Sequence, residues 1–312
     1  MPKAASVHIG LNHVDRAAYD GWDGVLAGCV NDAHDLSAVA ASEGFRTSIL
    51  TDRQATAPAV LAAIRAAATR LRSGDIFLLT FSGHGGQICD TEHGGDPPVG
   101  HDETWVCWDR QLLDDEVAAA LAGFEGDVRV LVVSDTSHCG TRGRYAMAAS
   151  PPVRTPDGAR RARLMPAGVA GRDALHRHAI YERARRNARA ELRRAMARLR
   201  TLTRREAALR KSTACLAARV VLLTASQDNQ VAYDGPGNGA FTAALLSVWD
   251  QGRFDGSHRE FASAIRAKLT AQSPTYLAVG HGDPAWEASR PFTVDLSADL
   301  ELIEDPDAAV TR

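Results

Sequence analysis

Apolar residues in the first part of the chain occur in short runs, and amphipathic stretches separate these runs. The runs contain many β-branched residues, which predicts strands, and some are apolar almost throughout, as in strands buried on both faces. The stretches between them carry apolar residues at helical spacing. We therefore expect strands and helices to alternate, which is typical of a parallel sheet with right-handed crossovers. The predicted strands are residues 5–10, 45–50, 75–81 and 128–133, and the predicted helices are 31–44, 57–71 and 113–121.

The second half of the chain interrupts this alternation and then resumes it. Residues 142–212 lack the strand pattern, although residues 179–209 have the Ala, Arg, Glu and Leu content of a helix. Earlier, residues 87–103 are rich in Gly, Pro and acids, so a loop is expected there. The tail after Ser297 is expected to fray. The remaining predicted elements are strands at 105–108, 220–225 and 291–296, and helices at 239–249 and 261–269.

The chain has 312 residues, of which 45% are hydrophobic, which suffices for one large domain or two small ones. Its apolar runs are too short to span a membrane, and no N-terminal hydrophobic signal is seen, so a cytoplasmic location is expected. The five cysteines are scattered, which favours free thiols in a reducing compartment. A zinc site made of Cys89, His93, His101 and Cys107 is disfavoured, because no CxxC pair accompanies these residues.

Charge is divided unevenly along the chain. Residues 154–211 contain 17 Arg and one Lys against five acids, whereas the whole chain has a formal net charge of −2. The rest of the chain is therefore strongly acidic. Such an acidic body should attract the basic segment and basic peptides, and it should repel nucleic acid.

Two of the predicted buried strands end in turns that carry reactive side chains. The strand at 128–133 leads into an acid, hydroxyls, an imidazole and a thiol at residues 134–140, and the strand at 75–81 leads into His84 between glycines. Open α/β sheets place their chemistry at the carboxyl ends of strands. If the two strands are parallel neighbours, His84 faces the 134–140 turn as a base faces a nucleophile. An ordinary strand-to-loop turn would also use Ser, Asp, Thr and Gly.

Seven short segments carry a resemblance to a known family, in order and at fitting spacing. They are GCVNDA (28–33), ILTDRQAT (49–56), FSGHGG (81–86), HDETW (101–105), LLDDE (112–116), SDTSHCGT (134–141) and GAFTAALL (239–246). Together they resemble the caspase-like cysteine proteases (peptidase C14), most closely the metacaspases and bacterial orthocaspases.

The resemblance implies an α/β fold of the caspase-hemoglobinase type, a three-layer αβα sandwich around a mostly parallel sheet, with an Arg-rich helical insert. It implies one catalytic domain built from several portions. These are a large-subunit portion (1–141), the insert (142–217), a small-subunit portion (218–296) and an acidic tail (297–312).

The resemblance also implies a Cys–His dyad, and here the chain departs from the family. The base histidine of the family lies in an SGHG motif, which implies His84. The nucleophile is the third residue of a D-x-C-H-S-G motif, but that position holds Ser137 in this chain and the usual serine position holds Cys139. A hydroxyl hardly ionises where a thiol does, so Ser137 is expected to lower activity by several orders of magnitude.

Three interpretations of Ser137 remain open. In the first, the active enzyme has Cys at position 137 and the serine is an inactivating substitution. In the second, Cys139 is the working thiol, because positions two apart on an extended segment face the same way. In the third, the protein is a natural pseudoprotease. The expected activity is that of a cysteine endopeptidase, and the alternative is an inactive scaffold that binds basic peptides.

The Arg- or Lys-specific branch of the family holds the basic side chain of its substrate with acids. The match implies Asp32 and Asp135, and Asp228 is a further candidate in the loop after residues 220–225. A guanidinium needs carboxylate partners, and each charge-assisted hydrogen bond contributes about 1.5–3 kcal/mol. Asp32 is equally suited to cap a helix. Backbone N–H groups near Gly85 and at the nucleophile are expected to form the oxyanion hole.

Calcium is a possible ligand, because many metacaspases need it, although no cofactor is expected to be required. The candidate ligands are acids that flank the expected active-site edge. They are Asp102, Glu103, Asp114 and Asp115. Carboxylate oxygens are the ligands that Ca²⁺ prefers. A solvated acidic loop followed by a helix cap accounts for the same residues.

The insert lies where caspase-like enzymes carry a linker that is often cut on activation, and it is rich in the residue that the expected pocket binds. Our hypothesis is that it is a self-cleaved or docked autoinhibitory segment. A rival interpretation is that its helix binds nucleic acid or an anionic membrane. Its arginines are spread around the helix, which favours the protease interpretation. The candidate cleavage sites, expected in flexible sequence, are Arg154, Arg160, Arg161, Arg163, Arg172 and Arg177.

The expected partners follow from the same resemblance. Basic peptides and proteins are the expected substrates, and an upstream protease or effector is a possible activator. A monomer is expected, and neither a membrane nor nucleic acid is an expected partner. Bacterial relatives take part in cell-death and anti-phage responses, which is an implication of the family alone.

Overall fold

The structure is a computed structural model of the chain. It describes residues 2–89, 101–139, 161–202, 216–226, 229–280 and 283–296.

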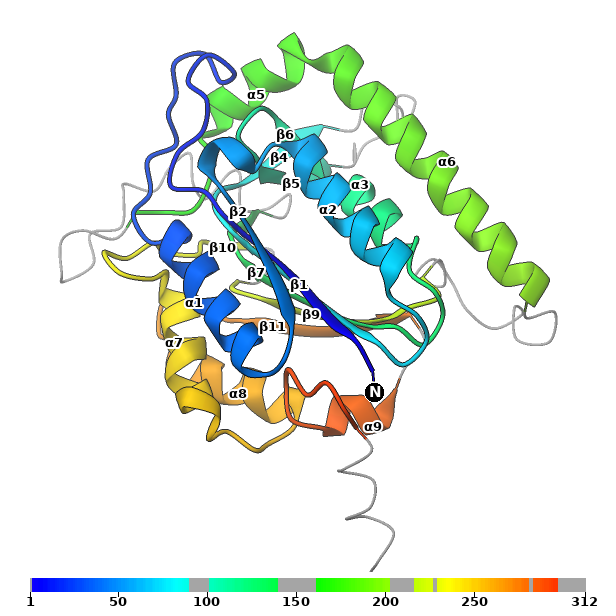
Figure 1. Cartoon of the computed structure of the whole chain (residues 1–312). Helices are drawn as coiled ribbons and strands as arrows, with labels where there is room; N and C mark the ends of the chain where they lie inside the picture. Colours follow the sequence, from blue (N-terminus) through cyan, green and yellow to red (C-terminus); the bar gives the residue numbers. More distant parts are fainter. Residues whose placement is uncertain are drawn as a thin grey trace, which may run out of the picture.

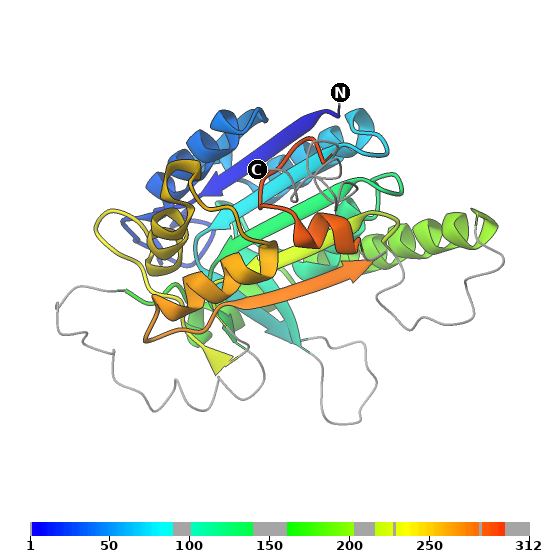
Figure 2. The ribbon, with the colours of Figure 1, turned by 90° about the horizontal axis from the view of Figure 1, so that it is seen from below.

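A six-stranded sheet forms the centre of the molecule, in the order β11-β9-β7-β3-β1-β2. All neighbouring strands are parallel except β11, which runs antiparallel to β9 at one edge. Figure 2 shows the strands side by side, from blue β1 through green β7 to orange β11. Their bounds are β1 Ala4–Gly10, β2 Arg46–Thr51, β3 Ile76–Ser82, β7 Arg129–Asp135, β9 Arg219–Thr224 and β11 Thr275–Gly280.

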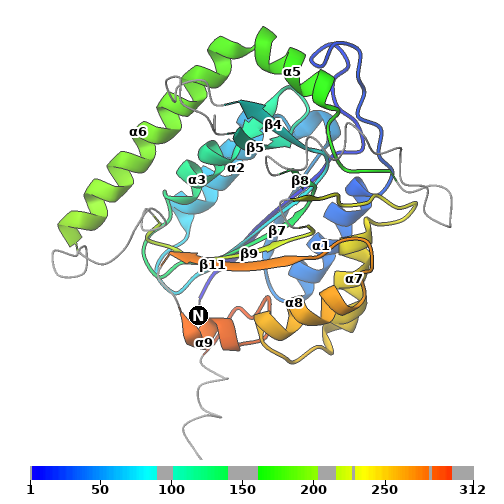
Figure 3. The same cartoon turned by 180° about the vertical axis from the view of Figure 1, so that it is seen from behind.

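Helices cover both faces of this sheet, with α1, α7 and α8 on one side and α2 and α3 on the other (Figures 1 and 3). Alternate residues of a strand pack against the two helical layers, because successive side chains point to opposite faces of the sheet. In β3, Leu78 packs in the cluster with the first layer and Phe77 in the cluster with the second. The helices are α1 Cys29–Ser42, α2 Ala57–Arg70, α3 Asp114–Leu121, α7 Ala240–Trp249, α8 His258–Ala267 and α9 Pro284–Ala288, with short 3-10 turns η1 Asp52–Gln54 and η3 Asp250–Gly252.

Two small sheets extend the carboxyl edge of the main sheet. One has the order β4-β5-β6 and the other pairs β10 with β8, both antiparallel. Their bounds are β4 Gly85–Cys89, β5 His101–Val106, β6 Gln111–Leu113, β8 His138–Cys139 and β10 Asn229–Gln230.

The described part of the insert forms two helices, α5 Ala167–His176 and α6 His178–Leu202. The long α6 runs along the outer side of α3 (Figures 1 and 3). Tyr181 and Ala184 of α6 are buried against Ile88 and Leu113. The described residues 161–202 of the insert are therefore packed on the body, and not merely tethered to it.

The predicted αβα sandwich with a mostly parallel sheet is confirmed, and the early elements lie where the apolar pattern indicated. Some local predictions were wrong. Residues 291–296 do not form a strand, because the chain turns there and Phe292 takes a left-handed φ of 65° with its ring buried. The sixth strand is β11, in a segment with no predicted element. Strand β4 ends and strand β5 begins inside the predicted loop at 87–103, and β6 and α5 were not predicted.

Candidate active site

The carboxyl ends of β3 and β7 bring the candidate dyad to one edge of the sheet. The two strands are parallel neighbours, and Ser82 of β3 is paired with Asp135 of β7. His84 and Ser137 each follow two residues later, and both are buried. The parallel register therefore puts the histidine turn beside the 134–140 turn, as the sequence predicted.

His84 is held in one tautomer by the backbone. Its Nε2 lies 3.0 Å from the carbonyl oxygen of Gly24. A carbonyl only accepts, so Nε2 carries the hydrogen and Nδ1 keeps its lone pair. Within the described residues, Nδ1 has no hydrogen-bond partner. Burial lowers the pKa of His84 to about 4, and the backbone oxygens of Gly24 and Leu164 oppose this shift. A neutral ring with an unbound Nδ1 is the state that a general base requires.

Residues 161–165 of the insert lie across this edge as an extended segment, which we call the docked arm. The carbonyl of Arg163 accepts hydrogen bonds from the backbone N–H of Gly85, at 3.0 Å, and of Ser137, at 3.3 Å. The N–H of Arg163 donates to the carbonyl of Ala232, and the N–H of Met165 donates to that of Gly85. Two N–H donors on one carbonyl, one of them from the nucleophile position, form the arrangement of an oxyanion hole.

The Arg163 side chain is fully buried and points into a pocket of acids. Its guanidinium forms ion pairs with Asp32 at 2.7 Å, Asp135 at 2.9 Å and Asp234 at 3.0 Å. It also donates to Ser82 Oγ at 2.7 Å and to the carbonyl of Asp135. Both terminal nitrogens of the guanidinium therefore have hydrogen-bond partners in a site that excludes water.

The charges in this pocket do not cancel, since three carboxylates surround one guanidinium. Burial alone would lower the pKa of Arg163, but Asp135, Asp32 and Asp234 outweigh it, and the pKa is raised well above its usual value. Burial raises the pKa of Asp135 to about 6, with Asp32 adding to the rise and Arg163 opposing it. The pocket thus favours a permanent cation.

Each acid is fixed by donors of the body. Asp32 accepts from Ser82 Oγ and from the N–H of Gly239, and Asp135 Oδ2 accepts from the N–H and hydroxyl of Thr242. A Cβ on Gly239 would stand 2.5 Å from the Arg163 guanidinium. The GAFT segment therefore lines the pocket with a residue that has no side chain, and this leaves room for the arginine.

The sequence identified two of these three acids. Asp32 is not the N-cap of α1, because Gly28 takes that position and the Asp32 carboxylate is turned toward Arg163. Asp234 was missed. It also accepts from the N–H groups of Ala27 and Gly28, so it joins the loop after β10 to the start of α1. Asp228, the acid predicted in this region, lies outside the described residues.

The nucleophile position is described only in part. Ser137 Oγ accepts a hydrogen bond from the N–H of Ala232 at 2.9 Å. Cys139 lies in β8, opposite Asn229 of β10, and its side chain lies outside the described part of the structure. The Ser137 hydroxyl is therefore hydrogen-bonded to the backbone and not to His84.

The other candidate cleavage sites differ in their surroundings. Arg161 is exposed and donates to the carbonyl of Val25, and Arg172 lies inside α5, paired with Asp20. Arg177 follows α5 and is bound to Asp173. Arg172 and Arg177 are thus fixed by ion pairs at helix α5, and Arg163 is buried. The prediction that these three cleavage sites lie in flexible sequence was therefore wrong. Arg154 and Arg160 lie outside the described residues.

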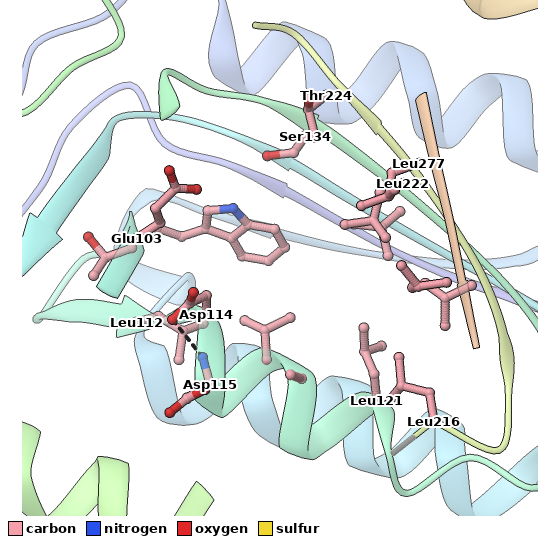
Figure 4. Close-up of a pocket in the computed structure, with 17 residues that line it drawn as sticks. Glu103, Leu112, Asp114, Asp115, Leu121, Ser134, Leu216, Leu222, Thr224 and Leu277 are labelled. Atoms are coloured by element: carbon pink, nitrogen blue, oxygen red, sulfur yellow. Dashed lines mark hydrogen bonds between the residues drawn. The ribbon is translucent and has the colours of Figure 1, made fainter. Parts of the chain in front are cut away.

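Three of the four acids predicted as calcium ligands lie at one end of an apolar cavity of about 340 Å³ beside α3. Figure 4 shows Glu103, Asp114 and Asp115 there, while Leu121, Leu216, Leu222 and Leu277 line the other end. Burial raises the pKa of Asp114 to about 7, and the nearby Asp102 adds to the rise.

Arginines of α6 form ion pairs with two of these acids, Asp102 and Asp115. The buried Arg185 binds Asp102 at 2.6 Å and Glu182 at 2.5 Å, and Arg189 lies 3.8 Å from Asp115. Over the residues that the structure describes, no group of three or more potential ligands is arranged to hold a metal ion. The four candidate acids thus do not fit a calcium ion in this arrangement.

A family model described as "Caspase domain" (peptidase C14) matches residues 13–291. The chain belongs to the caspase-domain family. The fold and the family are therefore those of cysteine peptidases, as the seven segments indicated.

Curated relatives agree with this family. Metacaspase-1 of Mycosarcoma maydis is 29% identical over 153 residues, which are 45% of this chain and 36% of the relative. Metacaspase-4 of Arabidopsis thaliana is 31% identical over 150 residues, 45% of this chain and 34% of the relative. The chain thus spans about a third of the length of these relatives.

A crystal structure of a protein from Geobacter sulfurreducens is 39% identical, with a TM-score of 0.77, and the match covers 94% of this chain and 99% of that chain. Among the described helices, none is long and apolar enough to cross a membrane.

Cys29 and Cys107 are free and buried, and burial raises the pKa of both thiols.

Proposed function

We propose that the chain is an endopeptidase of the metacaspase type that cleaves after Arg, and less readily after Lys, and that its own Arg163–Leu164 bond is a substrate. One observation carries the proposal. Arg163 presents its side chain to three carboxylates and its carbonyl to two backbone N–H groups, as a substrate residue before the cleaved bond would. Lys reaches fewer of these partners, because an ammonium lacks the fork of the guanidinium.

The chemistry follows from these positions. A thiolate at position 137 attacks the Arg163 carbonyl, and the N–H groups of Gly85 and residue 137 stabilise the oxyanion. His84 Nδ1 takes the thiol proton and delivers it to the nitrogen of Leu164, which is the leaving amine. The Leu164 backbone lies close enough to His84 to affect its pKa. Water, deprotonated by His84, then releases the acyl group.

Self-cleavage tests the proposal directly. In a Ser137→Cys chain we expect mass spectrometry to find a cut between Arg163 and Leu164, and Ser137→Cys with Arg163→Gln should lose that cut. The unaltered chain and its Cys139→Ala variant complete the panel. Cutting by the unaltered chain that Cys139→Ala abolishes would make Cys139 the nucleophile. Absence of any cut after Arg, together with no hydrolysis of a fluorogenic Arg amide, would refute the proposal.

A second candidate is an inactive scaffold that binds basic peptides. It is favoured by Ser137, whose hydroxyl is bound to Ala232 and not to His84. In that case the pocket would only hold Arg163 or an arginine of a partner. An Arg163→Gln chain that binds an Arg peptide, with Ser137→Cys inactive on every substrate, would support it. Nucleic-acid binding by α6 is disfavoured because Arg185 and Arg189 face acids of the body.

A further inference from the structure

The two sides of the Arg163–Leu164 bond are anchored very differently. Upstream, the described residues 161–163 are held by the pocket, by backbone hydrogen bonds with Ala232 and Asp234, and by the exposed Arg161, which donates to the carbonyl of Val25. Downstream, Met165 is buried in the main apolar cluster together with Val169 and Ala170 of α5. Breaking the bond would therefore leave the downstream side in place.

Polar contacts strengthen the downstream anchor. Asp173 of α5 is buried and accepts from Gln111 Nε2 at 2.8 Å and from the Tyr181 hydroxyl at 2.5 Å. Tyr181 in turn accepts from the N–H of Gln111. These contacts join α5 and α6 to β6, so the segment that begins at Leu164 is part of the folded body.

Leu164 itself is held at the reaction centre by its neighbours. Gly85 is bridged to Leu164, with its N–H on the carbonyl of Arg163 and its carbonyl accepting from Met165. After cleavage the new amine of Leu164 would stay within this bridge, beside His84. An oriented group of this kind has an effective concentration on the order of 10⁵–10⁸ M, which exceeds that of bulk water.

We propose that this retained amine is an acyl acceptor, so that the enzyme forms peptide bonds to Leu164 as well as breaking them. This inference rests on the proposed endopeptidase function. In a Ser137→Cys chain the amine nitrogen attacks the carbonyl of the thioester at position 137, His84 takes a proton from the amine, the C–S bond breaks, and the thiolate receives that proton. The products are an amide and the free thiol, without oxidant or reductant. The chain reseals its own cut in this way, and it joins other peptides that end in Arg to Leu164.

Two properties of the amine make the inference specific. The amine must be neutral to attack, and an α-amino group has a pKa of about 8. The ratio of bond formation to hydrolysis should therefore rise as the pH rises through that value. Retention depends on Met165, so Met165→Asp should undock Leu164 and lower the ratio at least tenfold. Leu175→Ala is the matched control, because Leu175 lies on α5 with 74% of its surface exposed.

The test uses a Ser137→Cys chain that has cut itself, mixed with an acetylated peptide thioester ending in Arg. Mass spectrometry of the fragment beginning at Leu164 is expected to show the added acyl mass, with Met165→Asp reducing it and Leu175→Ala leaving it unchanged. If the thioester is hydrolysed and the fragment keeps its mass, the inference is overturned while the proposed function stands. If the chain neither cuts itself nor consumes the thioester, the proposed function is refuted, and the inference that rests on it is refuted as well.

Discussion

Asp135 offers a substitution that removes a charge from the arginine pocket and little else. Its Oδ2 receives Arg163 and both donors of Thr242, whereas its Oδ1 has no partner among the described residues. In Asp135→Asn the amide oxygen can take the Oδ2 position and keep all three donors. The amide nitrogen then takes the vacant Oδ1 position. The variant removes the negative charge from this ion pair in nearly the same geometry, while the guanidinium keeps its positive charge.

The expected loss follows from that exchange. An opposite charge within about 4–6 Å favours the ionised state of a group by about 1–3 pKa units, and each unit corresponds to about 1.4 kcal/mol. Loss of the Asp135 charge should therefore cost about 1.4–4 kcal/mol, which corresponds to an affinity for arginine roughly ten- to a thousandfold lower. Asp32 and Asp234 remain in the pocket, so binding is weakened and not abolished.

The assay needs a pocket that the docked arm does not fill. We would measure KM and kcat for a fluorogenic Arg amide in a Ser137→Cys, Arg163→Gln background, with and without Asp135→Asn. We expect KM to rise and kcat to change much less, because the pocket lies away from the reacting bond. An unchanged KM, or a loss confined to kcat, would show that Asp135 does not hold the arginine.

The pH dependence of the same variant tests the charge itself. With arginine bound, the pKa of Asp135 is about 6, and removing the cation can only raise it. Arginine binding is therefore linked to proton release, so the affinity should fall as the pH falls toward 6 and level off below it. Asp135→Asn should flatten this part of the KM profile. A profile that keeps its slope in the variant would assign the titration to another group.

Two further predictions concern α6. Arg185→Met leaves Asp102 and Glu182 without their buried cation, so the free energy of unfolding in urea should fall by about 3–5 kcal/mol, whereas Arg194→Met, at an exposed position of α6, should change it far less. Because Arg185 binds Asp102 and no metal-binding group is arranged among the described residues, millimolar calcium should not raise the Tm of the chain. A calcium-dependent rise in Tm would mean that the acids rearrange around the ion.

The sheet was predictable where burial was complete. Strands β3 and β7 are buried at every residue, and each contains a continuous apolar run, at 76–79 and 130–133, so pattern and structure agree. The edge strand β11 has only half-buried or exposed residues, and its short apolar run at 276–279 was not interpreted as a strand. The reverse error arose at residues 291–296, where alternation resembled a strand but Phe292 is buried from a turn. Helix α5 was hidden by Gly168 and Gly171, which lower the helical propensity of the segment.

The site was predictable where a motif marked it. Ser82, His84 and the 134–140 turn sit at strand ends, so neighbouring parallel strands were enough to bring them together. Asp234 follows no such rule. It reaches the pocket because the loop after β10 folds over α1, and this is a tertiary contact without a local sequence signal. Arginine composition could likewise propose several cleavage sites without choosing among them.

What selects Arg163 is the register of the docked arm. Side chains alternate along an extended chain, so Arg163 and Met165 share one face while Ala162 and Leu164 share the other. Arg163 and Met165 are buried, and Ala162 and Leu164 are partly exposed. The Met165 side chain fits only an apolar pocket and the Arg163 side chain only an acidic one, and the backbone of Gly85 is hydrogen-bonded to both residues. A shift by one residue would put both side chains on the wrong face. The apolar anchor two positions downstream thus sets which arginine enters the pocket, and it is the same anchor that would keep Leu164 in place after a cut.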